Sequence, residues 1–324
     1  MYSLDSARIA SEPSPRTGFL SRPVAPLDDP LIAAIGHTPL VPLRAIVARA
    51  GGGFELWAKA EHLNPTGSVK DRTARGIVLD AIDAGLLEPG RTLMDASSGN
   101  TAVAYAMLGA RLGFPVELIL PANAHPSRVA RIRAFGASVV LTDASDGTDG
   151  AQREARRRAA EAPERYFYPD QYNSPSNPRA HYASTGPEIW HQSAERVSHF
   201  VAGVGTGGTI SGVSRFLKER NPTVRTIGVE PPGPIHGIEG LKHLPTALRP
   251  STYDERLIDS TIRVDTEDAL EMQLRLAREE GLQVGASAGA AVWAALEVGR
   301  STTGAVVVTI LPDGGHELDG GERK

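Results

Sequence analysis

The sequence of 324 residues contains no cysteine. Disulfide bonds and cysteine-ligated metal sites are therefore excluded, and a reducing compartment is permitted. The nine histidines are scattered along the chain and form no His-Glu-x-x-His pattern. We therefore expect no resident metal ion.

Long apolar runs are also missing. No stretch approaches the roughly 20 apolar residues of a membrane-spanning helix, and residues 1–30 lack the apolar segment of a signal peptide. The same 30 residues include five prolines and are expected to form a flexible arm, or one that a partner subunit orders. We expect a cytoplasmic protein with no membrane association.

Positive charge is not concentrated in any long stretch. The net charge is −4, and the short cluster Arg156-Arg157-Arg158 is expected to lie on the solvated face of a helix. We therefore expect no nucleic-acid partner. A hydrophobic content of 41% and a charged content of 22% are typical of a globular protein, and the length allows one large or two medium domains.

From residue 31 onward, runs typical of strands alternate with helical runs. This alternation predicts an α/β fold with mainly parallel sheets and helices on both faces. Ligands in such folds bind beyond the carboxyl ends of the strands. Thr266 is the expected N-cap of its helix. Residues 35–41 are predicted to form a turn that feeds a short strand. The further predicted strands cover 54–59, 92–96, 116–121, 138–141, 199–204, 224–230, 283–286 and 305–311, and the predicted helices cover 73–84, 102–112, 125–135, 150–162, 186–195, 210–219, 266–280 and 288–296. Residues 168–178 and 231–250 are expected to be loops.

Lys70 ends the segment Asn64-Pro65-Thr66-Gly67-Ser68-Val69-Lys70. The spacing places it in the first turn of a helix, where the positive end of the helix dipole disfavours a cation. A lone lysine at such a position is most often a solvated surface residue. An amine that must lose its proton to act as a nucleophile, however, benefits from this environment.

A glycine-rich turn follows the strand at 199–204. Gly203-x-Gly205-x-x-Gly208 formally matches the dinucleotide fingerprint, and Glu230 ends the next strand, so a nicotinamide dehydrogenase is one alternative. The physical content of the pattern is an anion site, because glycines let backbone N–H groups approach and the next helix supplies a positive end. Thr206 and Thr209 add hydroxyl donors that suit a single phosphate as well.

Two further turns carry hydroxyl groups. Gly285-x-Ser287-x-Gly289 formally matches the hydrolase nucleophile elbow, followed by Asp313 and His316, but those two residues share one short loop and cannot approach a serine from different directions. Ser287 alternatively offers its hydroxyl to a buried heteroatom of a ligand. The turn 97–101 suits a carboxylate at a helix N-terminus, although such residues also serve as helix caps.

Pyridoxal phosphate accounts for all of these features, because it has an aldehyde for a lysine, a phosphate for a glycine-rich turn and a ring nitrogen that needs a partner. Its amino-acid substrates bear a carboxylate. Segments 64–72, 97–101, 205–209 and 285–289 resemble, in the same order, four cofactor motifs of the cysteine synthase and cystathionine β-synthase family. Residues 35–41 resemble the opening motif of that family and residues 171–178 its Gln-x-Asn-x-Pro-x-Asn-Pro stretch. The resemblance covers about residues 31–315.

The resemblance implies a fold and a domain organisation. It implies two three-layer α/β domains with mainly parallel sheets, as in the tryptophan synthase β type. A larger domain with the phosphate loop would comprise 31–73 and 175–324, and a smaller mobile domain with the substrate loop would comprise 74–174. Family members are usually homodimers, so we expect a homodimer in which the N-terminal arm could lie across the partner.

The resemblance also implies residue roles. Lys70 would hold pyridoxal phosphate covalently and later remove the α-proton of the substrate. Asn100 would donate to the 3′ oxygen of the cofactor, and Ser287 would face its ring nitrogen. The phosphate would be held by Gly205, Thr206, Gly207, Gly208 and Thr209. The substrate carboxylate would be held by Ser97, Ser98, Thr101 and Gln171.

The implied reaction is β-replacement on an activated serine, either O-acetylserine or O-phosphoserine, with sulfide to give L-cysteine. Alternatives within the class are a cystathionine β-synthase, which uses a thiol, and a serine/threonine dehydratase. A non-catalytic amino-acid-binding protein and the dehydrogenase are alternatives from other classes, and neither needs Lys70. Lys242 and His243 stand where the family commonly has a glycine-rich segment. They could favour an anionic leaving group or acceptor, or could be ordinary loop charges.

Overall fold

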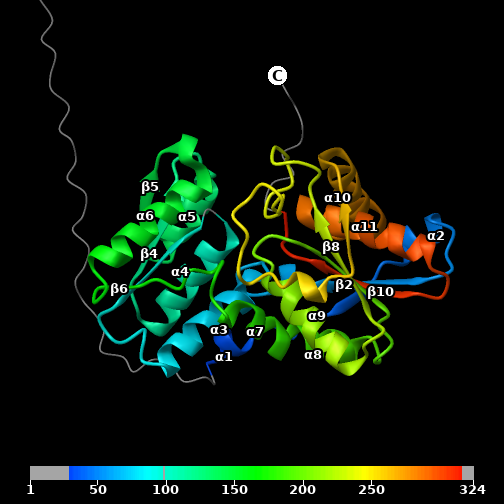
Figure 1. The fold of residues 1–324 in the computed structure, drawn as a ribbon, viewed down its shortest axis with the longest axis horizontal. Helices are drawn as coiled ribbons and strands as arrows, with labels where there is room; N and C mark the ends of the chain where they lie inside the picture. Colours follow the sequence, from blue (N-terminus) through cyan, green and yellow to red (C-terminus); the bar gives the residue numbers. More distant parts are fainter. Residues whose placement is uncertain (1–28, 98, 316–324) are drawn as a thin grey trace, which may run out of the picture.

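The computed structural model describes residues 29–97 and 99–315, which form two lobes, each built on its own sheet (Figure 1). The sheets contain six and four strands and share no strand. The strands are β1 (Leu40–Pro42), β2 (Glu55–Ala60), β3 (Thr92–Ala96), β4 (Val116–Pro121), β5 (Ser138–Thr142), β6 (Tyr166–Phe167), β7 (His199–Gly203), β8 (Arg225–Glu230), β9 (Ser260–Arg263) and β10 (Val306–Leu311).

The helices lie on both faces of these sheets (Figure 1). They are α1 (Pro30–Ala33), α2 (Arg44–Arg49), α3 (Lys70–Asp83), α4 (Asn100–Leu112), α5 (Pro126–Ala134), α6 (Gly147–Glu161), α7 (Ser176–Ala183), α8 (Thr185–Gln192), α9 (Gly208–Arg220), α10 (Thr266–Glu280) and α11 (Ala286–Ser301). Short 3-10 turns cover Glu61–Leu63, Ala144–Asp146 and Glu255–Leu257.

The larger sheet has the order β1-β2-β10-β7-β8-β9, and only β1 runs antiparallel to its neighbour. Its strands are apolar on both faces. Val201 and Val307 pack with α2, α10 and α11, whereas Phe200 and Val308 pack with α8 and α9. Because both faces are buried, the central strand β10 reads as a continuous apolar run rather than an alternating one.

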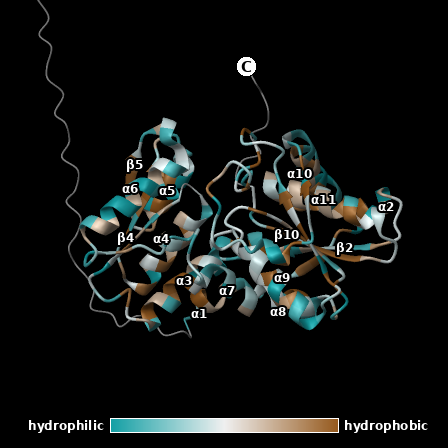
Figure 2. Cartoon of the chain, in the orientation of Figure 1, coloured by the Kyte–Doolittle hydropathy of each residue, from teal (hydrophilic) through white to brown (hydrophobic). Residues whose placement is uncertain are grey.

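The smaller sheet is fully parallel, in the order β5-β4-β3-β6. Leu93 and Leu118 pack with α3, α4 and α5 on one face, and Met94 and Ile119 pack with α6 on the other. Figure 2 shows the hydrophobic residues concentrated on the strands and on the inner sides of the helices of both lobes. The predicted fold class, two three-layer α/β units with mainly parallel sheets, is therefore confirmed.

Several local predictions were wrong. No strand forms at 283–286, because that segment pairs with no other strand and the Val284 carbonyl instead accepts from the Gln273 amide. Helix α7 begins at Ser176, inside the predicted loop, and β9 was not predicted. Asp265, not Thr266, is the N-cap residue of α10, and the Thr266 hydroxyl accepts from the Gly237 N–H.

The domain boundaries stay a prediction, although the structure shows how the elements cluster. Ile32 and Ile35 pack in the core of the smaller lobe, together with Ile77 and Val78 of α3. Figure 1 shows α3 and α7 side by side between the two lobes. The predicted N-terminal arm lies outside the described residues, apart from its last two positions.

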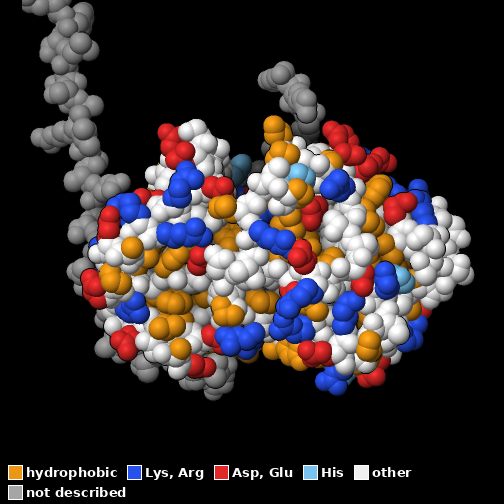
Figure 3. Space-filling model, in the orientation of Figure 1, with side chains coloured by type: hydrophobic (Ala, Val, Ile, Leu, Met, Phe, Trp, Pro, Cys, Tyr) orange, Lys and Arg blue, Asp and Glu red, His pale blue; other side chains and the backbone are white. Residues whose placement is uncertain are grey.

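The visible face carries acidic and basic side chains interspersed with one another (Figure 3). Arg157, from the arginine-rich segment, is mostly exposed and pairs with Glu154 and Glu161 of its own helix, as expected for a solvated face. Among the helices of the described ranges, none combines the length and the apolar character needed to cross a bilayer.

Candidate active site

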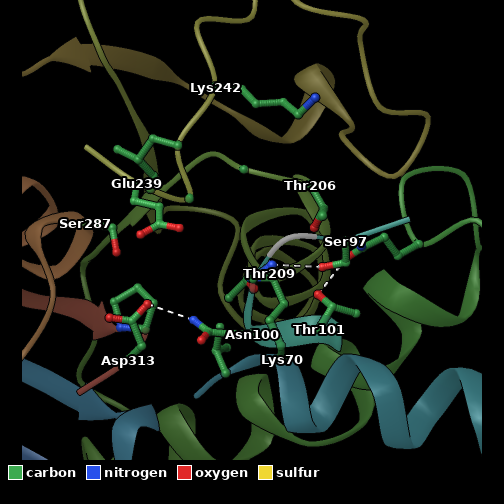
Figure 4. A pocket seen from close by; sticks show the side chains of 18 of the residues that line it. Lys70, Ser97, Asn100, Thr101, Thr206, Thr209, Glu239, Lys242, Ser287 and Asp313 are labelled. Atoms are coloured by element: carbon green, nitrogen blue, oxygen red, sulfur yellow. Dashed lines mark hydrogen bonds between the residues drawn. The ribbon is translucent and has the colours of Figure 1, made fainter. Parts of the chain in front are cut away.

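A cavity of about 360 Å³ lies where strands of both sheets end. Its walls come from segments far apart in the sequence: the start of α3, the turn after β3, the turn after β7, the loop 239–242, the start of α11 and the residues after β10. This is the place that parallel α/β sheets provide for a ligand, beyond the carboxyl ends of their strands. Figure 4 shows the side chains that converge there.

Lys70 is the first residue of α3 and lines the cavity. The preceding turn is fixed to the residues that follow β10. The Val69 N–H donates to the Pro312 carbonyl at 2.8 Å, and the backbones of Ser68 and Asp313 form an isolated antiparallel β-bridge. Burial lowers the pKa of the Lys70 amine, and the Asp313 carboxylate partly opposes this shift. The position of Lys70 at a helix N-terminus also disfavours the protonated amine and so lowers the same pKa. Lys70 is therefore suited to act as a nucleophile or base.

A buried ion network anchors the beginning of α3. Arg72 donates to Glu61 at 2.7 Å and to Glu188 at 2.7 Å, and the fully buried Lys59 lies 2.6 Å from Glu188. Two cations thus balance two carboxylates, which burial requires. The network joins β2, the turn after it, α3 and α8, so it fixes the helix that carries Lys70.

The glycine-rich turn after β7 is closely packed from behind. Gly207 has φ +82°, and a Cβ there would lie 2.5 Å from the Tyr253 Cβ. A Cβ on Gly205 would overlap the Gly240 carbonyl oxygen, and one on Gly208 would overlap the Asn177 amide. Glycine is therefore required at each position, and the turn leads directly into the N-terminus of α9. Such a turn presents N–H groups to an anion.

Two threonine hydroxyls accompany this turn into the cavity (Figure 4). Thr206 Oγ1 accepts from Asn177 Nδ2 at 3.1 Å, and Thr209 Oγ1 lies 3.2 Å from His181 Nε2. Burial, with the nearby Arg72 and Lys70 charges, holds the pKa of His181 well below its usual range, so His181 is neutral. A neutral imidazole supports the threonine without adding a charge.

The turn after β3 faces the cavity from the smaller lobe. Thr101 Oγ1 donates to Gln171 Oε1 at 2.7 Å, and Gln171 Nε2 donates back to the Ala96 carbonyl at 3.3 Å. Both side chains are buried, so their hydrogen bonds fix the shape of the turn. Asn100 is the first residue of α4, and its amide donates to Asp313 Oδ2 at 2.9 Å. Ser98 lies outside the described residues.

Ser287 reaches the cavity from the second position of α11, after Gly285. It is buried, and its hydroxyl makes no hydrogen bond to any residue within the described ranges. The hydrolase alternative is wrong, because no strand leads into Ser287 and the Asp313 side chain instead accepts from Asn100. His316, its third member, lies outside the described residues.

The cavity thus brings together Lys70, Ser97, Asn100, Thr101, Gln171, Gly205, Thr206, Gly207, Thr209 and Ser287. Gly208 lies behind the turn, against Asn177. The roles assigned to these residues stay a prediction. Sequence reasoning did not assign Asp313, Arg128, Glu239 or Tyr172 to this site. Asp313 could have been found, because it follows the apolar strand β10 at its carboxyl end.

These residues fit pyridoxal phosphate. The Lys70 amine has no ion pair or hydrogen bond within the described ranges, so it is available to an aldehyde. A side chain at Gly205 or Gly207 would disturb the turn. With glycine at both positions, the N–H groups of the turn can approach a phosphate. The buried Ser287 hydroxyl supplies one hydrogen-bonding partner for a ring nitrogen.

A sequence model of the family described as pyridoxal-phosphate dependent enzymes matches residues 31–313, so the chain belongs to that family. Pyridoxal phosphate is its cofactor, and the dehydrogenase alternative is wrong. The cysteine synthase of Aquifex aeolicus is 48% identical over 292 residues, which are 89% of each chain.

Solved structures agree with this assignment. Cysteine synthase from Entamoeba histolytica has a TM-score of 0.84 and 33% identity, covering 94% of this chain and 90% of its own. The O-acetylserine dependent cystathionine beta-synthase of Helicobacter pylori has a TM-score of 0.80 and 32% identity, covering 88% and 95%.

Proposed function

We propose that the protein makes L-cysteine from an activated serine and sulfide. The observation that carries this proposal is one cavity lined by a lysine amine with a lowered pKa, by the glycine-rich turn after β7, which suits a phosphate, and by the turn after β3, which suits a carboxylate. The relatives named cysteine synthase, similar over nine-tenths of the chain, support the same reaction.

The residues divide the work between them. Pyridoxal phosphate, when bound, supplies an aldehyde for an amine and an electron-withdrawing ring that acidifies the α-carbon of an amino acid. Lys70 Nζ, whose pKa is lowered by burial, accepts the α-proton and later returns a proton to the same carbon. The turn containing Ser97 and Thr101, shaped by Gln171, holds the substrate carboxylate and orients the Cα–H bond.

Ser287 influences which reaction follows. Its hydroxyl lies in the cavity wall and would face the ring nitrogen, where a serine does not stabilise a protonated nitrogen as a carboxylate would. This choice disfavours transamination and favours the loss of a leaving group from the β-carbon. The net reaction of a serine ester with hydrogen sulfide gives cysteine and the free acid of the ester.

The thiol-using alternative differs only in its nucleophile. The Helicobacter pylori relative is named as an O-acetylserine dependent cystathionine beta-synthase, which makes a larger thiol an alternative nucleophile for this chain. Rates measured with sulfide and with homocysteine, at equal concentration and with one amino-acid substrate, separate the two. A higher kcat/KM with homocysteine would replace sulfide in the proposal.

Substitution of Lys70 tests the mechanism. Lys70→Ala removes the base, so we expect cysteine formation from O-acetylserine and sulfide to fall by roughly 100- to 10,000-fold. The reconstituted variant should also lose the near-visible absorption band that the wild type shows. Lys218→Ala, outside the cavity and paired with Asp259, serves as the control. Full activity in Lys70→Ala would refute the assigned role.

We further propose a homodimer in the cytoplasm. The family resemblance motivates the dimer, and the absence of cysteine is compatible with a reducing compartment. Light scattering at micromolar concentration should give twice the chain mass, and a monomeric mass would reject the dimer. Cell fractionation should recover the protein with cytoplasmic markers.

A further inference from the structure

Lys242 is a cavity residue whose position is built into the fold. Its backbone N–H donates to the Val204 carbonyl at 2.9 Å, just before the glycine-rich turn. Gly203 and Gly205 allow this approach, because a Cβ on the first would lie 2.5 Å from Leu241 and one on the second would overlap Gly240. The loop that carries Lys242 is therefore held against the glycine-rich turn after β7.

Apart from Lys70, the other charged groups of the cavity wall have partners within the described ranges. Arg128 of α5 forms a bidentate ion pair with Glu239, with one pair of atoms 2.6 Å apart. The Asp313 carboxylate accepts from Asn100 at 2.9 Å. The two carboxylates are thus engaged, and the Arg128 charge is balanced by Glu239.

Lys242, by contrast, forms no ion pair with a residue of the described ranges. Its amine lies 4.5 Å from the centre of the Tyr172 ring, which stabilises a cation without neutralising it. Burial lowers the pKa of Lys242, and Asp149, an exposed residue of α6, opposes this shift from a distance. A partly desolvated cation of this kind is stabilised by an anion that enters the cavity.

We propose that Lys242 binds an anionic group on the β-carbon of the substrate, so that the enzyme uses O-phosphoserine in preference to a neutral serine ester. This inference rests on the proposed function. The substrate carboxylate already has the turn of Ser97 and Thr101 at the N-terminus of α4. Lys242 provides a separate, cationic site, which matches a substrate that carries a second anionic group. Figure 4 shows Lys242 beyond Thr206 and away from Asn100.

The balanced reaction explains what the ammonium group contributes. The Cβ–O bond breaks with its electron pair going to the phosphate, and the sulfur of hydrogen sulfide forms the new bond to Cβ. O-phosphoserine and hydrogen sulfide thus become cysteine and hydrogen phosphate, with no oxidant or reductant. Negative charge grows on the departing phosphate, and a nearby ammonium stabilises it more in the transition state than in the ground state.

The test compares two esters in the reconstituted enzyme, with sulfide held constant. The wild type should show a higher kcat/KM with O-phosphoserine than with O-acetylserine. Lys242→Ala and Lys242→Gln should lower kcat/KM for O-phosphoserine by roughly 10- to 150-fold, the effect of a lost charge-assisted hydrogen bond. Their kcat/KM for O-acetylserine should change less than about threefold, and Lys242→Arg should retain much of the phosphoserine activity.

A binding measurement supplements the kinetics. The phosphonate analogue of phosphoserine, in which a methylene replaces the bridging oxygen, cannot lose its phosphorus group. Its dissociation constant, followed by the absorption change of the bound cofactor, should rise on Lys242→Gln by a similar factor. That rise should shrink with added salt.

The contrary results are distinct. Equal losses for both esters would assign Lys242 to the α-carboxylate and overturn the inference. A wild type that turns over O-acetylserine but not O-phosphoserine would overturn it as well, while leaving cysteine synthesis intact. If neither ester is turned over, the proposed function fails and the inference fails with it.

Discussion

Gly207→Ala is the change whose cost follows most directly from the structure. Gly207 has φ +82°, a region that costs an alanine about 1–2 kcal/mol. A Cβ there would also lie 2.5 Å from the Tyr253 Cβ and 2.8 Å from its Cα. Carbon atoms in contact prefer about 3.5–4.0 Å, so the two segments must separate by about 1 Å. Overpacking of this kind adds about 1–3 kcal/mol.

Moving Gly207 away from Tyr253 would displace the part of the turn that is expected to bind the cofactor phosphate. Gly207 is the N-cap residue of α9, and its displacement moves the N–H groups expected to hold the phosphate. We therefore expect the free energy of unfolding of the apoprotein to fall by about 2–5 kcal/mol in urea. The dissociation constant of pyridoxal phosphate should rise at least about tenfold, as the loss of one hydrogen bond to a charged group implies.

Gly304→Ala is the matched control. Gly304 has φ +75° but no atom within 4 Å of a Cβ, and it does not line the cavity. This variant should show the backbone cost alone and an unchanged cofactor affinity. If Gly207→Ala and Gly304→Ala gave the same stability and the same affinity, the argument from close packing at the turn would be refuted.

Two further predictions concern the smaller lobe. Thr101→Val leaves Gln171 Oε1 without its donor, so the KM for the amino acid should rise by roughly 5- to 100-fold, whereas Thr101→Ser should remain close to the wild type in steady-state assays. Burial raises the pKa of Asp95 to about 7, above the value of about 3.9 in an unfolded chain. The native state then binds the extra proton between these values, so the stability of the wild type relative to Asp95→Asn should fall as pH rises from about 4 to about 7. Urea unfolding across this range would show a flat difference if Asp95 were ionised throughout.

Much of the fold could be predicted because burial leaves a clear sequence pattern. The strand at 92–96 and the helix at 266–280 were predicted with the boundaries that β3 and α10 have. In β3 the apolar residues are buried on both faces, and α10 buries one stripe that includes Ala269, Met272 and Leu276. Elements of this kind can be predicted from their own residues, because their apolar pattern matches the faces that they bury.

The missed elements depend on distant parts of the chain. Strand β9 is an edge strand with the polar sequence Ser-Thr-Ile-Arg, and its pairing with β8 defines it. Helix α7 has a sequence rich in Pro, Asn and Ser that is typical of a loop, but it packs between α3 and α9. Tertiary contacts decide both cases against local propensity.

The site was predicted to a similar extent. Local motifs pointed to Lys70, the glycine-rich turn and Ser287, because each feature is contained within a few residues. The contact between Asn100 and Asp313 joins residues 213 positions apart, and no local pattern announces it. The ion pair of Arg128 with Glu239 likewise joins the two lobes across 111 positions.

The most direct test of the central claim is to locate the covalent bond between protein and cofactor. The chain has five lysines, at positions 59, 70, 218, 242 and 324. The protein should be reconstituted with pyridoxal phosphate, reduced with borohydride, digested and mapped by mass spectrometry. We predict that the mass of the reduced cofactor lies on Lys70 alone. A label on another lysine, or active enzyme that borohydride leaves unlabelled, would contradict the account.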